Sequence, residues 1–228
     1  MGVSILKGLL EFLQACWDVL PKLLGGCTIT IELTLVTIAL GTILGLIVAL
    51  ARISKIKPLS KVMQFYIWVL RGTPLLLQLF FLYYALPNVG IVIDRFPSAA
   101  IAFVINLSAY MAEIIRSGIQ SIDKGQMEAA KALGMTYMQA IRRVIIPQAI
   151  KRMIPPASNE FTAVVKDTAL VSFISLPDLM KRTKDIFAGT YAASLYEAAL
   201  VSAILYLTMT TLITYVFGVI EKKLSIYE

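Results

Sequence analysis

Four polar side chains interrupt an otherwise apolar stretch of the chain at helical spacing. Asn106, Tyr110, Glu113 and Ser117 follow one another at steps of four, three and four residues, which places them on one face of an α-helix. A charge at the centre of a bilayer costs about 2.5–3.5 kcal/mol on insertion scales, so a carboxylate here needs a compensating role. The stripe predicts either hydrogen bonds that fix helix packing or, as we favour, the lining of a solvated cavity.

A second polar group follows two consecutive prolines later in the chain. Asn159 and Glu160 lie in the first turn of the predicted helix, and Asp167, seven residues after Glu160, shares its face. Structural roles are also open: Asn159 and Glu160 suit a helix N-terminus, and Asp167 can pair with Lys166 at the membrane edge. The alternative is a site shared with the first stripe, whose candidate solute-binding residues are Tyr110, Glu113, Asn159, Glu160 and Asp167.

The composition excludes most kinds of catalytic site. The chain has no histidine, which removes His-based acid–base catalysis, Ser-His triads and most catalytic zinc sites. Cys16 and Cys27 lie in no CxxC or CxxH pattern. Of the 228 residues 58% are apolar and 15% charged, and the mean hydropathy is +0.80, so the chain is too apolar for a soluble domain. The net charge of +7 does not indicate nucleic-acid binding, because the bases lie between apolar runs.

Five apolar stretches are candidates for membrane-spanning helices. The fourth is the weakest, since it is short and carries Glu160. The apolar segment 168–176 that follows it suits a second half-helix or a re-entrant piece. The predicted spans are 25–51, 62–86, 96–119, 153–165 and 188–220.

Two local features predict helix geometry inside these spans. In the second span, Arg71 is followed closely by Pro74, which removes a backbone donor and frees the carbonyl of Leu70, so a kink is expected there. In the first span, Gly41 and Gly45 match the pattern GxxxG, which favours close helix packing.

The basic residues determine the predicted orientation. Thirteen of the 21 Lys and Arg residues lie in three segments, 52–61, 116–152 and 222–223. If these segments face the cytoplasm, the positive-inside rule places the N-terminus outside and the C-terminus inside. Residues 221–228 then form a cytoplasmic tail.

The first 24 residues predict an amphipathic helix on the outer leaflet. Apolar residues fill this segment except for polar ones at steps of three and four, namely Ser4, Lys7, Glu11, Gln14, Asp18 and Lys22. Gly25–Gly26 is expected to supply the turn into the first span. The expected fold is therefore all-α and integral to the membrane, with an interfacial helix over 1–24 and five transmembrane helices within 25–220.

The long loop 120–150 is predicted to form short helices on the cytoplasmic side. A helix containing Glu128, Ala129 and Ala130 ends at Gly134, and a second helical stretch ends at Pro147. An exposed helix with small alanine side chains can enter a groove on a partner, and Gly134 lets the next helix leave at an angle. We therefore expect Glu128, Ala129, Ala130 and Gly134 to contact a partner protein.

This loop resembles the EAA loop of ABC-importer permease subunits. The resemblance lies in Glu128-Ala-Ala, Gly134 and Pro147, with Val144 and Ile146 as mild departures from the family's Ile-x-Leu-Pro ending. Further segments are similar to the polar amino acid subfamily, which takes histidine, glutamate, glutamine, arginine and opines. They are Arg71–Leu75, Ala112–Ile114, Ser121–Gln126, Pro155–Pro156 with Asn159, and Lys166–Thr168.

The resemblance implies a complex in a prokaryotic plasma membrane. It has two permease subunits with five spans each, for which we favour a homodimer, and two ATP-binding subunits that receive the coupling helices of the EAA loop. An external solute-binding protein delivers the amino acid, and ATP-driven closure switches the spans from inward-open to outward-open. This chain has no Gly-x4-Gly-Lys-Ser/Thr loop, so ATP and Mg²⁺ are expected on the partner and no cofactor on this chain.

The charges of the spans favour a cationic solute. Glu32, Glu113, Glu160 and Glu197 oppose Arg71, so acids exceed bases by 4 − 1 = 3. Because an unpaired buried charge is costly, we expect a basic amino acid, arginine first and then lysine or histidine.

Two other classes of protein compete with this interpretation. An ATP-independent channel or secondary transporter has no use for an EAA loop, and the sequence has no convincing internal repeat. An intramembrane enzyme needs a nucleophile with a base or a metal site, and the composition leaves little to build one.

Overall fold

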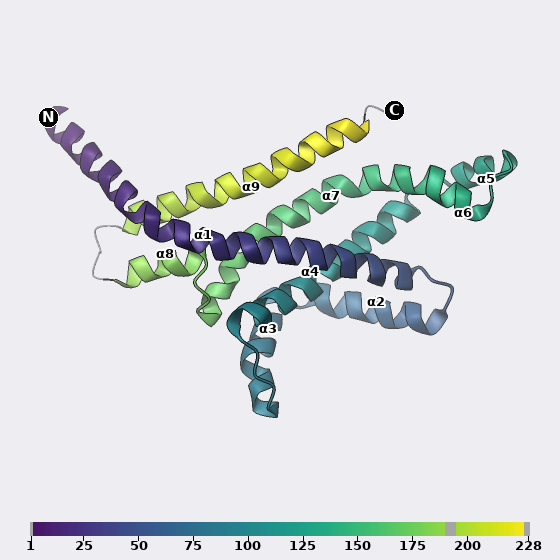
Figure 1. The fold of residues 1–228 in the computed structure, drawn as a ribbon, viewed down its shortest axis with the longest axis horizontal. Helices are drawn as coiled ribbons and strands as arrows, with labels where there is room; N and C mark the ends of the chain where they lie inside the picture. Colours follow the sequence, from purple (N-terminus) through teal and green to yellow (C-terminus); the bar gives the residue numbers. More distant parts are fainter. Residues whose placement is uncertain (1, 190–194, 226–228) are drawn as a thin grey trace.

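The computed structural model describes residues 2–189 and 195–225, and these form helices and connecting turns with no strand in those ranges. Long helices lie side by side, and shorter segments connect them (Figure 1). The all-α prediction is confirmed. The elements are α1 Gly2–Arg52, α2 Lys57–Gly72, α3 Leu75–Phe80, the π-helical η1 Phe81–Ala85, the 3-10 helix η2 Leu86–Val89, α4 Arg95–Gln120, α5 Lys124–Ala132, α6 Tyr137–Ala140, the π-helical η3 Ile141–Ile145, α7 Ile146–Asp167, the 3-10 helix η4 Thr168–Ile174, α8 Leu179–Ala188 and α9 Leu195–Ser225.

Three described helices have the length and apolar composition to cross a membrane, namely α1, α4 and α9. A fourth candidate is α2 together with the segment Leu75–Val89, which is bent from α2 by 102°. The weakest predicted span, 153–165, lies within α7, which is long enough but carries polar residues along one face. The expected half-helix at 168–176 is η4, which continues α7 as far as Ile174.

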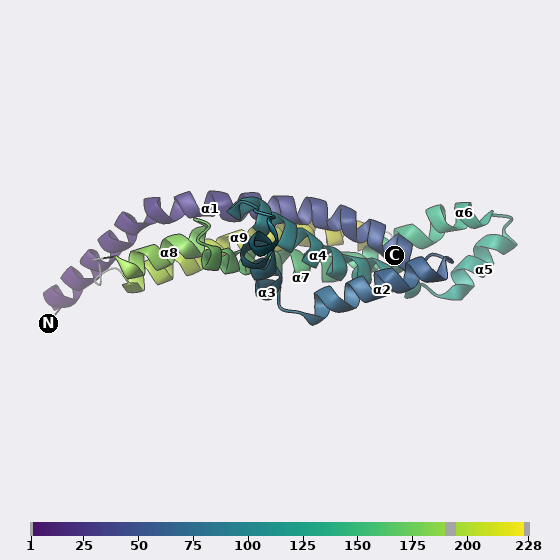
Figure 2. The ribbon, with the colours of Figure 1, turned by 90° about the horizontal axis from the view of Figure 1, so that it is seen from below.

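The long helix α1 packs along α4 (Figure 2). A Cβ added to Gly41 would lie 2.9 Å from Leu107 Cδ2, and one added to Gly45 would lie 2.6 Å from Met111 Cβ. Real Cβ atoms do not come this close to other carbon atoms, so the two glycines let the helices approach. The packing predicted from GxxxG is confirmed.

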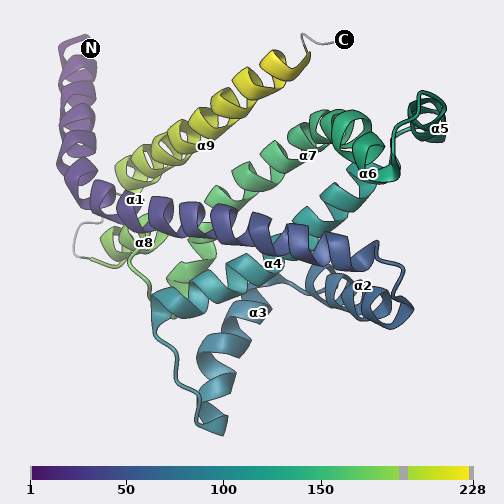
Figure 3. The same ribbon diagram turned by 45° about the vertical axis from the view of Figure 1, so that its right-hand side comes forward.

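The turn predicted at Gly25–Gly26 is wrong, because α1 continues through both glycines. A Cβ on Gly26 would lie 2.8 Å from the backbone of Asp178, so this glycine makes room for the chain that enters α8. The first part of α1 still runs at an angle to the rest (Figure 3). Pro21 lies inside α1 and cannot donate the helical hydrogen bond, which permits a bend. The described part of segment 1–24 is therefore the bent beginning of α1.

The break between α2 and α3 lies at Thr73–Pro74, where the sequence predicts a kink. The carbonyl of Leu70, which loses its helical donor, accepts hydrogen bonds from Gln78 Nε2 at 2.9 Å and from Asn106 Nδ2 at 3.3 Å. Gln78 Oε1 in turn accepts from Asn106 Nδ2 at 3.1 Å. Two side-chain amides, one from α3 and one from α4, thus replace the missing backbone donor and hold the bend.

Two of the four apolar clusters among the described residues join α1 to the later part of the chain. The larger one joins α1, α4, α7 and η4 around Phe103, which is 1% exposed, with Leu33 and Val171. The smaller one joins the early part of α1 to α8 and α9 through Leu23, Leu179 and neighbouring side chains. The first cluster fixes the positions of α4 and α7, which carry most of the polar residues identified from the sequence.

Candidate functional site

A cavity of about 440 Å³ lies beside the break between α2 and α3, where α4 and α7 approach it. The residues of the break form one wall, the polar face of α4 forms another, and α7 supplies the two carboxylates that share a face. The break at Thr73–Pro74 therefore ends α2 and also forms part of the cavity wall. The lining residues are Arg71, Gly72, Thr73, Pro74, Leu75, Asn106, Tyr110, Glu160, Ala163 and Asp167.

Three charged side chains line this cavity. The guanidinium carbon of Arg71 lies 5.1 Å from the ring centroid of Tyr110, within the range of a cation–π contact. Neither Arg71 nor the carboxylates of Glu160 and Asp167 belong to an ion pair within residues 2–189 and 195–225. The cavity thus offers one cationic and two anionic groups, each able to pair with a charged solute.

The cavity brings together three of the five predicted solute-binding residues, Tyr110, Glu160 and Asp167. Asn159 is exposed and does not line the cavity, because the position next to Glu160 points about 100° away around the helix. Glu113 does not line the cavity either and lies one helical turn beyond Tyr110.

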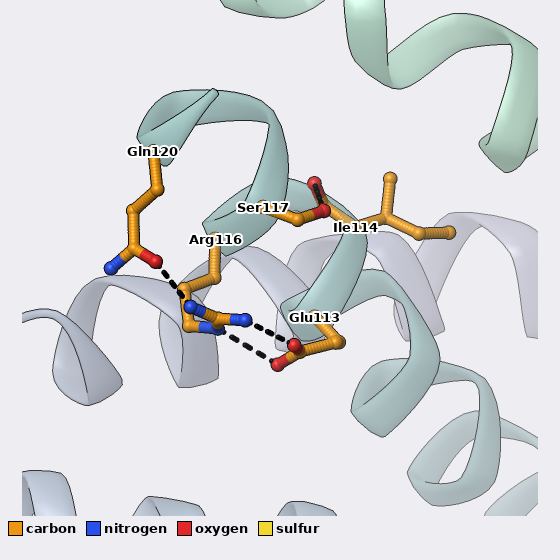
Figure 4. A network of polar contacts seen from close by, with 5 residues as sticks. All are labelled: Glu113, Ile114, Arg116, Ser117 and Gln120. Carbon is orange, nitrogen blue, oxygen red and sulfur yellow. Dashed lines mark hydrogen bonds and ion pairs between the residues drawn. The ribbon is translucent and has the colours of Figure 1, made fainter. Parts of the chain in front are cut away.

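Glu113 is paired with Arg116 on the same helix (Figure 4). Arg116 Nε donates to Glu113 Oε2 at 2.9 Å, and a second N–H of the guanidinium pairs with the other carboxylate oxygen. The third guanidinium nitrogen donates to Gln120, so the network follows α4 towards its C-terminal end. The Arg116 and Glu113 side chains keep 25% and 29% of their surface exposed, so the pair is only partly buried.

Sequence reasoning missed Arg71 as a lining residue, although the residue interrupts a predicted span. It assigns the Arg71–Pro74 segment to a kink, and the kink is present, but the same segment also faces the cavity. Thr73 was missed for the same reason. An available signal was the charge itself, since an intramembrane base implies a solvated or paired environment.

The loop 120–150 projects at one end of the molecule (Figure 1). Of the predicted coupling residues, Glu128, Ala129 and Gly134 are exposed, and Ala130 is buried. Gly134 has a φ of +80°, in the left-handed region that favours glycine, and its N–H donates to the Lys131 carbonyl at 2.9 Å. This glycine ends α5 and lets α6 begin in a new direction, as the sequence predicts.

Large apolar side chains are exposed near this turn. Leu133 is 81% exposed, Met138 is 68% exposed and Tyr137 is 61% exposed. The next turn begins with a complete capping box, in which Thr136 and Gln139 bond to each other's backbone N–H. The capping box and Gly134 thus present apolar side chains on an ordered surface.

The loop is attached to both α4 and α7. Ile122, Ile145 and Ala149 form a buried cluster beneath it, and Arg152 of α7 donates to the carbonyl of Ser121 just after α4. These contacts join the loop to the two helices that carry Tyr110 and Glu160 in the cavity wall.

One buried ionisable group lies outside the spans, at the start of α8. Asp178 has no exposed surface and caps α8 by accepting hydrogen bonds from the N–H groups of Met180 and Lys181. Burial raises the pKa of this carboxyl from 3.8 to about 6, although the two N–H groups and the charge of Lys184 oppose the change. The cap thus remains partly protonated in mildly acidic solution.

Residues 41–226 match the family described as binding-protein-dependent transport system inner membrane components. The chain belongs to this family. The matched residues include all those that line the cavity and the whole loop 120–150.

Similar proteins narrow the class further. The chain is 43% identical to the L-cystine transport system permease protein TcyB of Bacillus subtilis (strain 168), covering 100% of this chain and 94% of that protein. It is 38% identical to the arginine transport system permease protein ArtQ of the same organism, covering 90% and 94%. The crystal structure of an amino acid ABC transporter with histidines has a TM-score of 0.83 and 42% identity, covering 89% and 94%. The chain is a multi-pass inner-membrane permease subunit of an amino acid ABC importer.

Proposed function

We propose that this permease subunit carries basic amino acids, arginine first and then lysine or histidine. The supporting observation is that Arg71, Glu160 and Asp167 line one cavity without pairing directly. Arginine has one carboxylate and two cationic groups, which match these three partners one for one. Glutamine has one of each and cystine two of each, so either solute leaves a charge without a partner, and an unpaired desolvated charge is costly.

In the proposed complex, Arg71 holds the α-carboxylate of the solute. Glu160 and Asp167 hold the ammonium and the side-chain cation, and the ring of Tyr110 covers the solute from α4. Glu113 acts when the solute leaves the cavity. The cationic side chain of the solute then replaces Arg116 as the partner of the Glu113 carboxylate. Asn159 lies beside Glu160 and has no direct role in the state described above.

The orientation that we propose places the N-terminus outside and the C-terminus in the cytoplasm. The turn between α1 and α2, the loop 120–150 and the C-terminal end of α9 lie towards the same end of the helices (Figure 1). These three regions carry the basic segments 52–61, 116–152 and 222–223. Their common location supports a single cytoplasmic end.

Energy coupling is assigned to partner subunits. Two separate ATP-binding subunits bind ATP and Mg²⁺ and dock on the surface around Gly134, Leu133 and Met138. A second copy of this chain completes the membrane dimer, and an external solute-binding protein delivers the amino acid. Movement of the loop then shifts α4 and α7 together and alternates the access of the cavity.

Uptake by the assembled complex in proteoliposomes tests the solute. Glu160→Gln should lower arginine uptake by on the order of tenfold or more, because a hydrogen bond to a charged group contributes about 1.5–3 kcal/mol. Glu11→Gln is the matched control, since it removes the same charge from an exposed position of α1 far along the chain from the cavity. Uptake of glutamine or cystine as efficient as that of arginine, unaffected by Glu160→Gln, would refute the choice of solute and leave the transporter class intact.

A further inference from the structure

The turn between α1 and α2 has an unusual distribution of charge. Between Glu32 and Asp94 the chain has no acidic residue, and bases gather in the turn. Arg52 has a structural role there: its Nη1 donates to Ser60 Oγ at 2.9 Å, and Ser60 Oγ donates back to the Arg52 carbonyl at 2.6 Å. The turn is thereby closed, and its remaining bases are exposed lysines without an ion pair among the described residues, namely Lys55, Lys57 and Lys61.

Two of these lysines continue into a ring-bearing face of α2. Lys57, Lys61, Phe65 and Trp68 follow at steps of four, four and three, so they share one side of the helix. All four are exposed, Phe65 at 63% and Trp68 at 69%, and the two ring centroids lie 5.8 Å apart. At 1.5 Å per residue the face is roughly 16 Å long, close to half of a hydrocarbon core of about 30 Å.

We propose that this face is a binding site for an anionic phospholipid. The phosphate lies between Lys57 and Lys61 with Lys55 nearby, and one acyl chain runs over Phe65 and Trp68. The first turn of α2 has no acidic residue and no side-chain cap, so its lysines lie against the positive end of the helix dipole. A bound anion offsets the repulsion between these lysines and the positive end of the helix dipole. The rings of Phe65 and Trp68 extend away from the phosphate position and can contact an acyl chain, which a free phosphate ion lacks.

The choice of leaflet rests on the proposed orientation, because anionic lipid is concentrated in the cytoplasmic leaflet. The preference for anionic lipid itself rests only on the lysines and rings of this face. A topology map and a lipid-binding measurement can therefore fail independently.

Fluorescence quenching of Trp68 tests the site directly. The chain has two tryptophans, so Trp17→Phe leaves Trp68 as the only one. The full-length chain is placed in nanodiscs of phosphatidylcholine containing a small fraction of brominated phosphatidylglycerol or of brominated phosphatidylcholine. We expect brominated phosphatidylglycerol to bind near Trp68 on the order of fivefold more strongly, and salt to weaken this preference.

Lysine substitutions distinguish a specific lipid-binding site from a general electrostatic attraction of anionic lipid to the basic protein. Lys57→Gln with Lys61→Gln should abolish the preference for phosphatidylglycerol. Lys124→Gln with Lys151→Gln removes the same charge elsewhere and should leave it intact. Equal quenching by the two brominated lipids, or equal effects of the two double variants, would overturn the proposal. Trp68 that neither lipid quenches would also overturn it, because no lipid would then reach this face.

Discussion

Gly25 and Gly45 lie on the same helix, and the structure predicts opposite effects for the same substitution. A Cβ added to Gly45 would lie 2.6 Å from Met111 Cβ and 3.0 Å from the carbonyl oxygen of Ser108. These two atoms cannot move unless the α4 backbone moves, so Gly45→Ala must push α1 and α4 apart. At Gly25 no atom lies within 4 Å of the added Cβ.

The magnitudes follow from these contacts. Overpacking a tight interior costs about 1–3 kcal/mol. Replacing an unobstructed helical glycine by alanine stabilises by about 0.5–1 kcal/mol, because the unfolded chain loses conformational freedom. Both glycines lie within α1, so this gain applies to both variants, and Gly45→Ala should have a free energy of unfolding about 1–3 kcal/mol lower than that of Gly25→Ala.

Reversible denaturation of the two variants in the same detergent, followed by far-ultraviolet circular dichroism, measures this difference. The wild-type chain should lie between them. If Gly45→Ala is as stable as Gly25→Ala, then α1 and α4 do not approach each other as closely as described above.

Three further predictions concern the loop, the cap of α8 and the contact between α4 and α7. Gly134→Val should reduce solute-stimulated ATP hydrolysis severalfold in the full complex, whereas Gly134→Asn should retain most of it, because asparagine tolerates a positive φ and a β-branched residue does not. Asp178→Asn should keep the shorter of the two cap bonds, from the Lys181 N–H, and remove a pH dependence of stability. Because burial raises the pKa of Asp178 from 3.8 to about 6, the folded chain binds this proton more tightly than the unfolded chain, and wild-type stability should fall by on the order of 2–3 kcal/mol as pH rises through that range. Gly118→Ala should destabilise by about 1–2 kcal/mol, and Met153→Ala in the same chain should offset part of this loss, because the nearest atom to the added Cβ is Met153 Cγ at 2.5 Å.

Each of these three has a result that contradicts it. Equal ATP hydrolysis by Gly134→Val and the wild type would show that the left-handed turn is not needed for docking. A slope of stability against pH that is the same in Asp178→Asn and the wild type would assign the titration to another group. Strictly additive effects of Gly118→Ala and Met153→Ala would show that the two residues do not share a contact.

The features predicted correctly from the sequence depend on local chemistry. Pro74 breaks its helix because it lacks an N–H, and Gly41 and Gly45 allow close packing because they lack a Cβ. Glu160 and Asp167 share a cavity wall because helical periodicity alone places them on one face. These effects need only the neighbouring residues.

The features that were missed depend on contacts between distant segments. Gly26 resembles a turn residue, but a glycine is needed at this position because the backbone of Asp178, about 150 residues later, packs against it. Arg71 was assigned to a kink because its other neighbour, Tyr110, comes from α4. Glu113 is part of the predicted solute site because the sequence alone does not decide whether its carboxylate pairs with Arg116 or with a solute.

The central claim is that one base and two acids in a single cavity bind a cationic amino acid. Binding of arginine and of citrulline to the assembled complex, measured by calorimetry without the solute-binding protein, tests it most directly. Citrulline has the shape of arginine without the side-chain charge, so only the pairing with a carboxylate differs. Arginine should bind at least about tenfold more tightly, and Asp167→Asn with Glu160→Gln should remove the difference. Equal affinities for arginine and citrulline in the wild-type complex would contradict the claim.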